Sequence, residues 1–380
     1  MKNILKYPAI VIFTAFILCF SVLDLFKKDT NFSEMENRVL QQRPEFSVNA
    51  LLETSDDQKY TGKYEKYVND QFIFRNEWIS LKSITETVLG KQENNGIVYG
   101  KDGYMFERFD SLDEVRVNKN TDFINQYLQK YDVKSTVALI PNAYMLLPDK
   151  LPYGLPMMNQ QAEAEKIFAN LTSDKLSTVY LAPFEHEDEY IYYKTDHHWT
   201  TLGAYYAYCN LMQSKGKTPV ELDEIEQYKK EVPNFYGTYY SKAKKLNSEV
   251  DSIVYYDIPA ASVVINGDEK TSLYNYPQFE KRDAYAGFLF GNNGLTVIKS
   301  DHNKDHNEGE NSRILIIKDS YANCFIPFLT YNYDEIYVVD LRGLAQRMSQ
   351  LMSENEFDEV LIMYNFKNFV TDTNIARLIF

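Results

Sequence analysis

The sequence predicts an α/β protein with one parallel β-sheet of about five strands and helices on both faces. Five short runs of branched apolar residues are typical of buried parallel strands. The segments between them are long enough for the helical crossovers that parallel strands require. The expected strands are residues 135–141, 178–183, 313–318, 335–340 and 359–364. The expected helices are residues 121–131, 160–171, 200–215, a segment from 321, 344–354 and a terminal helix.

The composition limits the class of partner. The 380 residues carry 40 Lys and Arg against 54 Asp and Glu, a net charge of -14. An acidic protein is repelled by nucleic acid and by anionic membrane surfaces, so we expect neither nucleic acid nor an anionic membrane surface as a partner. The 31 tyrosines and 23 phenylalanines either fill the core or, in part, line a sugar-binding groove, where a flat ring with a polar tip suits a carbohydrate face.

Residues 1–28 predict a signal anchor with one transmembrane helix. An apolar run from Ala9 to Phe26 is preceded by two lysines and followed by two more, and its length is at the short end of what a bilayer requires. No small-residue cleavage pattern follows the run. We therefore expect the segment to remain attached and the rest of the chain to lie outside the cytoplasm. A cleaved secretory signal is the alternative.

Residues 29–95 predict a tether and a helical region. Residues 30–57 are polar with scattered prolines, whereas 60–89 carry apolar and aromatic residues at helical spacing, which predicts an amphipathic region packing on the body. Residues 95–107 predict a hairpin. The main domain is expected at 96–380, interrupted at 219–312 by a β-rich insertion of short apolar runs broken by Gly, Pro, Asn and Asp.

Two distant stretches supply the residue types of a serine nucleophile site. Asp196 and His198 lie two apart in a loop before a helix, and Ser320 follows the strand 313–318. A hydroxyl nucleophile needs an imidazole base, and the imidazole needs a carboxylate that orients it. Ligands of parallel sheets bind beyond the carboxyl ends of the strands. We therefore predict that Asp196, His198 and Ser320 form a triad; the alternative for Ser320 is a helix N-cap.

Three further residues are expected around this triad. A tetrahedral oxyanion needs hydrogen-bond donors, and the backbone N–H groups of Ser320 and Tyr321 and the side-chain amide of Asn142 are candidates. Asn142 could equally be a turn residue after Pro141. His197 should point away from its neighbour in an extended loop and support the site from behind, although the two histidines could exchange these roles.

We expect no metal and no cofactor. Neither of two possible ligand clusters has the helical spacing or the paired cysteines of a strong zinc motif. The clusters are Asp196, His197, His198 with His186, and Asp301, His302, Asp305 with His306. Cys324, which follows Ser320 by one helical turn, is expected to be a small buried packing residue.

The tetrad Asp196-His197-His198-Trp199 resembles the signature of the DHHW family, relatives of the alginate O-acetyltransferases within the SGNH hydrolase-like group. Other segments are similar to that family in the same order: Glu36-Asn37-Arg38, Tyr67 to Arg75, Gly100 to Phe106, Ile140-Pro141-Asn142, Phe235-Tyr236-Gly237-Thr238 and Asp319-Ser320. The order of the triad, with Asp and His before Ser, resembles the permuted arrangement of the alginate acetyltransferases. Lys318 stands where the wider group has the Gly of Gly-Asp-Ser.

The resemblance implies an SGNH hydrolase-like, flavodoxin-like catalytic domain over residues 96–380. It implies a cell-membrane protein with a single-pass anchor that transfers acetyl groups to hydroxyls of a cell-envelope or secreted polysaccharide through an acetyl-serine at Ser320. Because acetyl-CoA is not supplied outside the membrane, it also implies a membrane-bound O-acyltransferase partner as acetyl donor. A carbohydrate acetylesterase with the same triad and a non-catalytic polysaccharide-binding or assembly protein are the alternatives.

Overall fold

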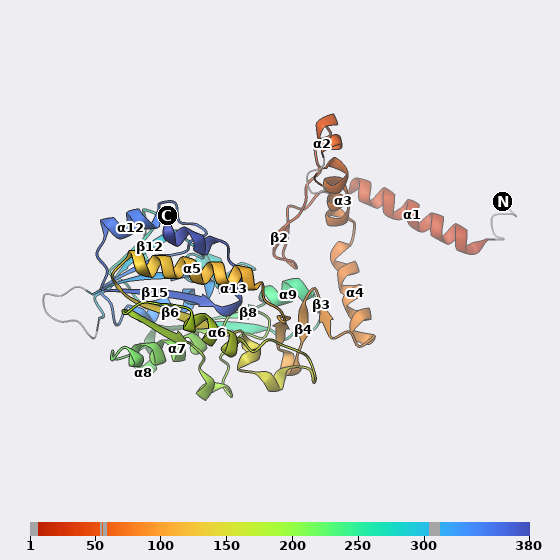
Figure 1. Ribbon diagram of the computed structural model, residues 1–380. Coiled ribbons are helices and arrows are strands. Elements are labelled where there is room, and N and C mark those ends of the chain that lie inside the picture. Colours follow the sequence, from red (N-terminus) through yellow and green to blue (C-terminus); the bar gives the residue numbers. More distant parts are fainter. Residues whose placement is uncertain (1–6, 54, 56–58, 304–311) are drawn as a thin grey trace. The chain divides into compact units, whose positions relative to one another are not determined.

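The computed structural model describes residues 7–53, 55, 59–303 and 312–380. The chain divides into two compact units (Figure 1). The N-terminal unit comprises the residues up to 94 together with 241–247, and the body comprises 95–240 and 248–380.

A mostly parallel sheet forms the centre of the body, which confirms the predicted α/β class. Its order is β11-β10-β12-β14-β13-β15-β6-β7. The five strands at one end of this order pair in parallel and coincide with the five predicted runs. They are β6 (Lys134–Ile140), β7 (Leu176–Tyr180), β13 (Arg313–Lys318), β14 (Glu335–Val339) and β15 (Glu359–Asn365).

The sheet has eight strands, not the five that the sequence predicted. The β-rich segment extends it antiparallel to β14 with β12 (Leu295–Lys299), β10 (Ser262–Ile265) and β11 (Asp268–Lys270). Burial alternates along β10 and β12, as in strands with one solvated face, a pattern distinct from the continuous apolar runs of the buried strands. The extension also covers the edge that β14 would otherwise leave unpaired. A separate ribbon pairs β8 (Lys229–Phe235) with β9 (Asp251–Tyr256).

Helices cover both faces of the sheet. Three of the longer helices, which begin at residues 114, 160 and 201, have a side-chain N-cap. The side chains of Asp113, Asn159 and Thr200 each accept a hydrogen bond from a backbone N–H in the first turn. Helices α5, α12 and α13 lie on one face and α7 on the other (Figure 1). The helices are α5 (Glu114–Lys130), α6 (Gln160–Ala169), α7 (Thr201–Ser214), α8 (Leu222–Ile225), α9 (Thr238–Ala243), α10 (Tyr276–Phe279), α11 (Ile326–Leu329), α12 (Met348–Glu354) and α13 (Phe366–Thr371).

The predicted hairpin is present as β4 (Ile97–Tyr99) and β5 (Met105–Glu107). Asp102 and Gly103 make the turn with positive φ angles of 54° and 78°. The N–H of Met105 donates to the carbonyl of Lys194 at 2.8 Å. The hairpin therefore supports the chain immediately before the Asp-His-His-Trp tetrad.

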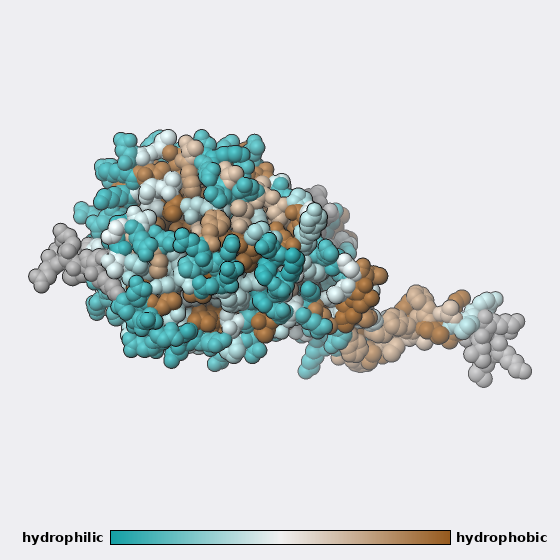
Figure 2. All heavy atoms as spheres, turned by 90° about the horizontal axis from the view of Figure 1, so that it is seen from below, coloured by the Kyte–Doolittle hydropathy of each residue, from teal (hydrophilic) through white to brown (hydrophobic). Residues whose placement is uncertain are grey.

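Among the described residues of the N-terminal unit, one helix, α1 (Pro8–Phe26), is long and apolar enough to cross a membrane, a property it shares with signal sequences. Figure 2 shows its surface as predominantly hydrophobic. The other elements are β1 (Phe32–Ser33), β2 (Arg38–Val39), α2 (Val48–Leu52), α3 (Tyr60–Gln71), α4 (Arg75–Val88) and β3 (Glu93–Asn94).

The predicted helical region 60–89 consists of two helices, α3 and α4. The break between α3 and α4 has Phe74 in the left-handed region at a φ of 56°. Several apolar side chains of α4 are exposed. Within the unit, the Glu36 carboxylate pairs with Arg75 and Lys244. Burial raises the pKa of Glu36, but these cations outweigh it and hold that pKa below its ordinary value.

Candidate active site

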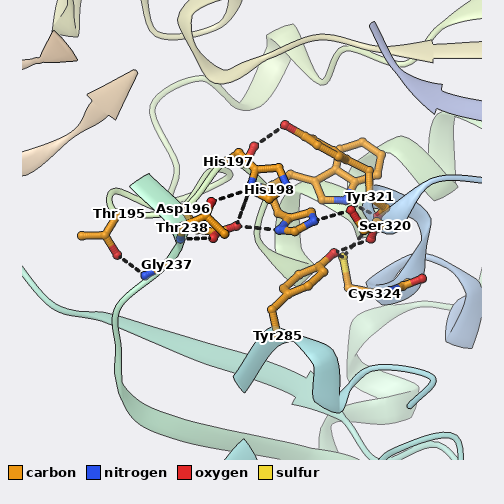
Figure 3. A network of polar contacts seen from close by, with 12 residues as sticks. Thr195, Asp196, His197, His198, Gly237, Thr238, Tyr285, Ser320, Tyr321 and Cys324 are labelled. Atoms are coloured by element: carbon orange, nitrogen blue, oxygen red, sulfur yellow. Dashed lines mark hydrogen bonds and ion pairs between the residues drawn. The ribbon is translucent and has the colours of Figure 1, made fainter. Parts of the chain in front are cut away.

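The fold brings the three residues of the predicted triad together. Ser320 begins a 3-10 turn, Ser320–Cys324, two residues after the last residue of β13. The Nε2 atom of His198 lies 2.8 Å from the Ser320 hydroxyl, and its Nδ1 atom lies 2.5 Å from Oδ1 of Asp196 (Figure 3). Asp196 and His198 are buried, whereas Ser320 is half-buried. The three side chains therefore form a continuous hydrogen-bonded chain that ends at a hydroxyl with solvent access.

Hydrogen bonds hold the Asp196 carboxylate in its ionised form. Its Oδ1 accepts from the His198 backbone N–H at 3.0 Å, and its Oδ2 accepts from the Thr238 N–H at 2.7 Å. Burial alone would raise the pKa of this carboxyl. The imidazoles of His197 and His198 and the donated hydrogen bonds outweigh burial, so that the pKa lies far below its ordinary value. The carboxylate is thus a fixed negative charge beside the imidazole.

His197 lies behind the pair. Its Nδ1 atom is 2.6 Å from the Thr238 hydroxyl and 3.5 Å from Oδ1 of Asp196. It is His198, and not His197, that the structure places against Ser320. Their rings lie side by side with centroids 3.8 Å apart, so the expectation that the two side chains point in opposite directions is wrong.

Tyr285 was missed by the sequence reasoning. Its ring stacks on the His198 imidazole with centroids 3.7 Å apart and planes 10° apart. Its hydroxyl donates to the Ser320 carbonyl at 3.1 Å and lies 3.3 Å from Sγ of Cys324. One side chain therefore contacts both the base and the segment that carries the serine (Figure 3). No motif marks this position, because residue 285 reaches the site only through the fold of the β-rich segment.

Asp319, and not Ser320, caps the 3-10 turn. Its Oδ1 accepts from the Tyr321 N–H at 2.9 Å. The Ser320 hydroxyl is therefore not used as a cap. The same contact corrects one expectation, since the Tyr321 N–H is already engaged and is not an open donor. Among the described residues, the Ser320 N–H has no acceptor.

Asn142 is brought to Tyr321 and not directly to the serine. Gln160 fixes its side chain, because Gln160 Nε2 donates to Asn142 Oδ1 at 2.7 Å. Asn142 Nδ2 is then 3.5 Å from the Tyr321 hydroxyl. That hydroxyl donates to the carbonyl of His197. Asn142 is therefore part of a buried polar network that supports the tetrad loop.

Buried side chains surround the segment that carries the serine. Trp199 is fully buried, and its indole N–H donates to the Tyr321 carbonyl at 2.8 Å. Lys318 is also fully buried and donates to the side chains of Asn292 and Asn323 at 3.0 and 2.6 Å. Burial lowers the pKa of Lys318 to about 8. Burial also raises the pKa of Cys324 to about 12, so the thiol is not a competing nucleophile.

The ligand atoms of Asp196, His197 and His198 lie within 4.8 Å of one another, close enough in principle for a metal ion. Each of these groups is committed to a protein partner, however, as described above. His186 does not join them, because it pairs with Glu189 and stacks on Tyr206. The arrangement is that of a proton relay more than of a metal site. Asp305 and His306 of the second cluster lie outside the described residues.

The buried carboxylate of Asp251 holds the loop that carries the tetrad. The Asp251 carboxylate accepts from the backbone N–H groups of Lys194 and Thr195 at 2.9 and 2.8 Å and from the Thr195 hydroxyl at 2.5 Å. The Thr195 hydroxyl in turn accepts from the Gly237 N–H at 2.9 Å. The segment 237–238 is therefore tied both to the loop and to Asp196.

We expect Gly237→Ala to impair the site without abolishing folding. A Cβ atom at this position would lie 2.1 Å from Cβ of Asp196, so the carboxylate must move. Overpacking of this kind costs about 1–3 kcal/mol, and displacement of a reacting group by about 1 Å can cost on the order of 10²-fold in rate. Thermal unfolding and the rate of modification of Ser320 measure the two effects. The control is Gly154→Ala, where a Cβ meets nothing within 4 Å and only the positive φ is strained; an equal loss of rate in both variants would contradict the explanation.

Comparison with solved structures shows where this fold recurs. A DHHW family protein from Eubacterium siraeum DSM 15702 matches with a TM-score of 0.61 and 23% identity, over 75% of this chain and 95% of that chain. PatB1 from Bacillus cereus matches with a TM-score of 0.60 and 22% identity, over 73% of this chain and 98% of that chain. PatB1 from Bacillus cereus with a sulfonyl adduct matches with a TM-score of 0.58 and 20% identity, over 73% of this chain and 97% of that chain. The O-acetyltransferase domain of Pseudomonas putida AlgJ matches more weakly, with a TM-score of 0.44 and 13% identity, over 74% of this chain and 98% of that chain.

The first three matches show a shared fold. A search of curated proteins finds no match. The family pattern described as DHHW protein matches residues 92–339, which is more than half of the chain. The matched range contains the tetrad, the Gly237-Thr238 pair and Ser320. The chain therefore belongs to the DHHW protein family.

Proposed function

We propose that this protein is an extracytoplasmic O-acetyltransferase that acts on a cell-envelope or secreted polysaccharide through an acetyl-serine intermediate. The observation that carries the proposal is the hydrogen-bonded chain from Asp196 through His198 to the hydroxyl of Ser320. This geometry meets the requirement of nucleophilic catalysis, in which a base contacts the nucleophile and a third group orients the base.

The first half-reaction forms the acetyl-enzyme. Ser320 Oγ attacks the acetyl carbonyl of the donor while its proton passes to Nε2 of His198. The tetrahedral intermediate then collapses, and the leaving oxygen of the donor takes that proton from His198. The backbone N–H of Ser320 is the donor that we assign to the oxyanion.

The second half-reaction passes the acetyl group to the acceptor. A sugar hydroxyl gives its proton to Nε2 of His198 and attacks the acetyl carbon, and collapse of the intermediate returns the proton to Ser320 Oγ. Asp196 accepts the Nδ1 hydrogen throughout and stabilises the imidazolium that forms in each half. No group of the protein is consumed, so the cycle closes.

The acetyltransferase assignment is supported by the family. The DHHW proteins resemble alginate O-acetyltransferases, and PatB1, which shares the fold, has been solved with a sulfonyl adduct. On this proposal α1 holds the body outside the membrane, and a membrane-bound O-acyltransferase partner presents the acetyl group. The polysaccharide acceptor is proposed on the same grounds.

The proposal is tested by following the acetyl group. The purified protein is first treated with a sulfonyl fluoride and digested, and we expect the adduct on the peptide that contains Ser320. It is then given an activated acetyl ester with and without an oligosaccharide acceptor. Acetyl transfer to the sugar is the expected result. Release of free acetate at the same rate with and without acceptor would instead identify an acetylesterase, and no adduct at Ser320 would leave only a binding or assembly role.

We expect Tyr285 to contribute through its ring more than through its hydroxyl. The ring lies flat on the His198 imidazole and favours the cationic form that both half-reactions pass through. Tyr285→Phe keeps the stack and should retain most of the transfer rate. Tyr285→Leu removes it and should lower kcat by about tenfold, since such contacts contribute on the order of 1 kcal/mol. A Phe variant as impaired as the Leu variant would assign the effect to the hydroxyl.

A further inference from the structure

The break between α3 and α4 is packed against α1. The ring of Phe20 lies 6.3 Å from that of Phe72, 6.4 Å from that of Phe74 and 5.8 Å from that of Trp78, measured between centroids. Beside these rings, the backbone N–H of residue 73 donates to Asp24 at 3.1 Å. All of these residues belong to the N-terminal unit. The segment 72–78 therefore lies alongside the last two turns of α1.

This contact sets a depth for the segment relative to a bilayer. Phe20 precedes the end of α1 at Phe26 by six residues, which corresponds to about 9 Å along a helix. When α1 spans a membrane, the segment 72–78, which contacts Phe20 and Asp24, must therefore lie within about 9 Å of its outer end. Amphipathic helices that bind membranes bury their apolar face to about 5–10 Å, at the boundary between headgroups and acyl chains.

One face of α4 is apolar and exposed. Its residues recur at intervals of three and four, which places them on one side of the helix. Their exposed fractions are 51% for Phe74, 38% for Trp78, 53% for Leu81, 44% for Ile84 and 81% for Val88. A different side carries Lys82 and Glu86, which pair at 3.8 Å. A row of large apolar side chains of this extent marks an interaction surface, and its contact with α1 makes it continuous with the surface of that helix.

The charge distribution favours a lipid surface as the occupant. The part of the N-terminal unit that follows α1, residues 27–94 and 241–247, has 13 Lys and Arg against 12 Asp and Glu, whereas the body has 25 against 41. An anionic membrane therefore repels the body but not this unit. A hollow of about 500 Å³ beside the end of α1 is lined by three basic residues, two acidic residues and two tyrosines, which are Lys27, Lys28, Arg43, Asp24, Asp29, Tyr64 and Tyr67. Basic and tyrosine side chains are typical of the headgroup region.

We propose that the segment 72–78 and the apolar face of α4 lie in the outer leaflet of the membrane that α1 crosses. The N-terminal unit is then a membrane-surface module: one helix spans the bilayer, and a second lies in its interface. This inference concerns lipid contact alone. Its test does not depend on whether the protein transfers acetyl groups.

The test uses the fluorescence of Trp78. The chain has two tryptophans, and the other, Trp199, is fully buried in the body. The full-length protein is placed in nanodiscs at one copy per disc, made of phosphatidylcholine and phosphatidylglycerol with bromine atoms at shallow or deep acyl positions. Trp78→Phe is measured in parallel, so that the difference between the two proteins reports Trp78 alone.

We expect the Trp78 emission to be quenched, and quenched more by bromines at shallow positions than at deep ones. Equal emission in brominated and unbrominated discs would overturn the proposal and would point to a protein partner or a second copy on this face. Quenching of equal size in the Trp78→Phe protein would overturn it as well, because it would come from Trp199. Leu81→Lys provides a second test, because a charge on the apolar face of α4 should weaken the quenching of Trp78. Glu86→Lys, on a different side of the helix, should leave the quenching unchanged.

Discussion

Ser320→Ala is expected to abolish acetyl transfer while leaving the fold intact. Loss of the nucleophile alone in a serine triad costs on the order of 10⁶ in kcat, because the remaining residues cannot act without it. The structural cost should be small, since the serine hydroxyl is half-buried and does not cap the turn that begins there. Transfer of acetyl from an activated ester to an oligosaccharide measures the first effect, and thermal unfolding measures the second.

Ser353→Ala is the matched control for this variant. Ser353 is exposed, and its hydroxyl donates only to the Gln350 carbonyl within α12. We expect it to transfer acetyl at the rate of the unmodified protein. Transfer by Ser320→Ala within tenfold of this control would show that another group, or a water molecule, takes the role assigned to the serine.

Asp196→Asn is expected to lower kcat by roughly 10⁴-fold, the size of the effect in the serine-protease triad. The Asn side chain would still accept from the Thr238 N–H through its oxygen, whereas the His198 backbone N–H would lose its acceptor at Oδ1. Its NH₂ group, however, would face Nδ1 of His198 and favour the tautomer with hydrogen on Nε2. That tautomer cannot accept the Ser320 proton. Steady-state kinetics of transfer measure the loss, with Asp149→Asn on the surface as control; a loss below tenfold would contradict the assigned role.

The same variant should also change how stability depends on pH. The folded-state pKa of Asp196 is depressed, so this carboxylate stabilises the fold above its unfolded pKa of about 3.8 and loses that contribution as pH falls. Asp196→Asn should therefore unfold at a lower temperature than the unmodified protein at pH 7. The difference between them should shrink as pH falls below about 4. A difference that does not depend on pH would show that the lost stability comes from packing and not from charge.

The sequence indicated the parts of the site whose signals are local. Branched apolar runs marked the five parallel strands, and the spacing of Asp196 and His198 marked the pair that the structure joins at 2.5 Å. Ser320 could be selected because it follows a buried strand at the edge where the other two residues lie. These inferences needed only periodicity and the known placement of ligands in such sheets.

Contacts that depend on tertiary structure could not be predicted in the same way. Tyr285 stacks on His198 from a part of the chain that bears no motif. The engagement of the Tyr321 N–H follows from the rotamer of Asp319, which the sequence does not determine. Likewise, the three antiparallel strands were assigned to an insertion because alternating patterns do not reveal which sheet they join. The break at Phe74 rests on a positive φ angle that is uncommon for a bulky residue.

The most direct test of the account is to trap the acetyl-enzyme. The full-length protein is mixed with an activated acetyl ester in the absence of acceptor, quenched in acid within one turnover and analysed by tandem mass spectrometry. We expect one acetyl group on Ser320, its loss when an oligosaccharide is added before the quench, and acetylated sugar in equal amount. Acetylation at another side chain, or acetylated sugar formed without any acetyl-serine, would contradict the central claim.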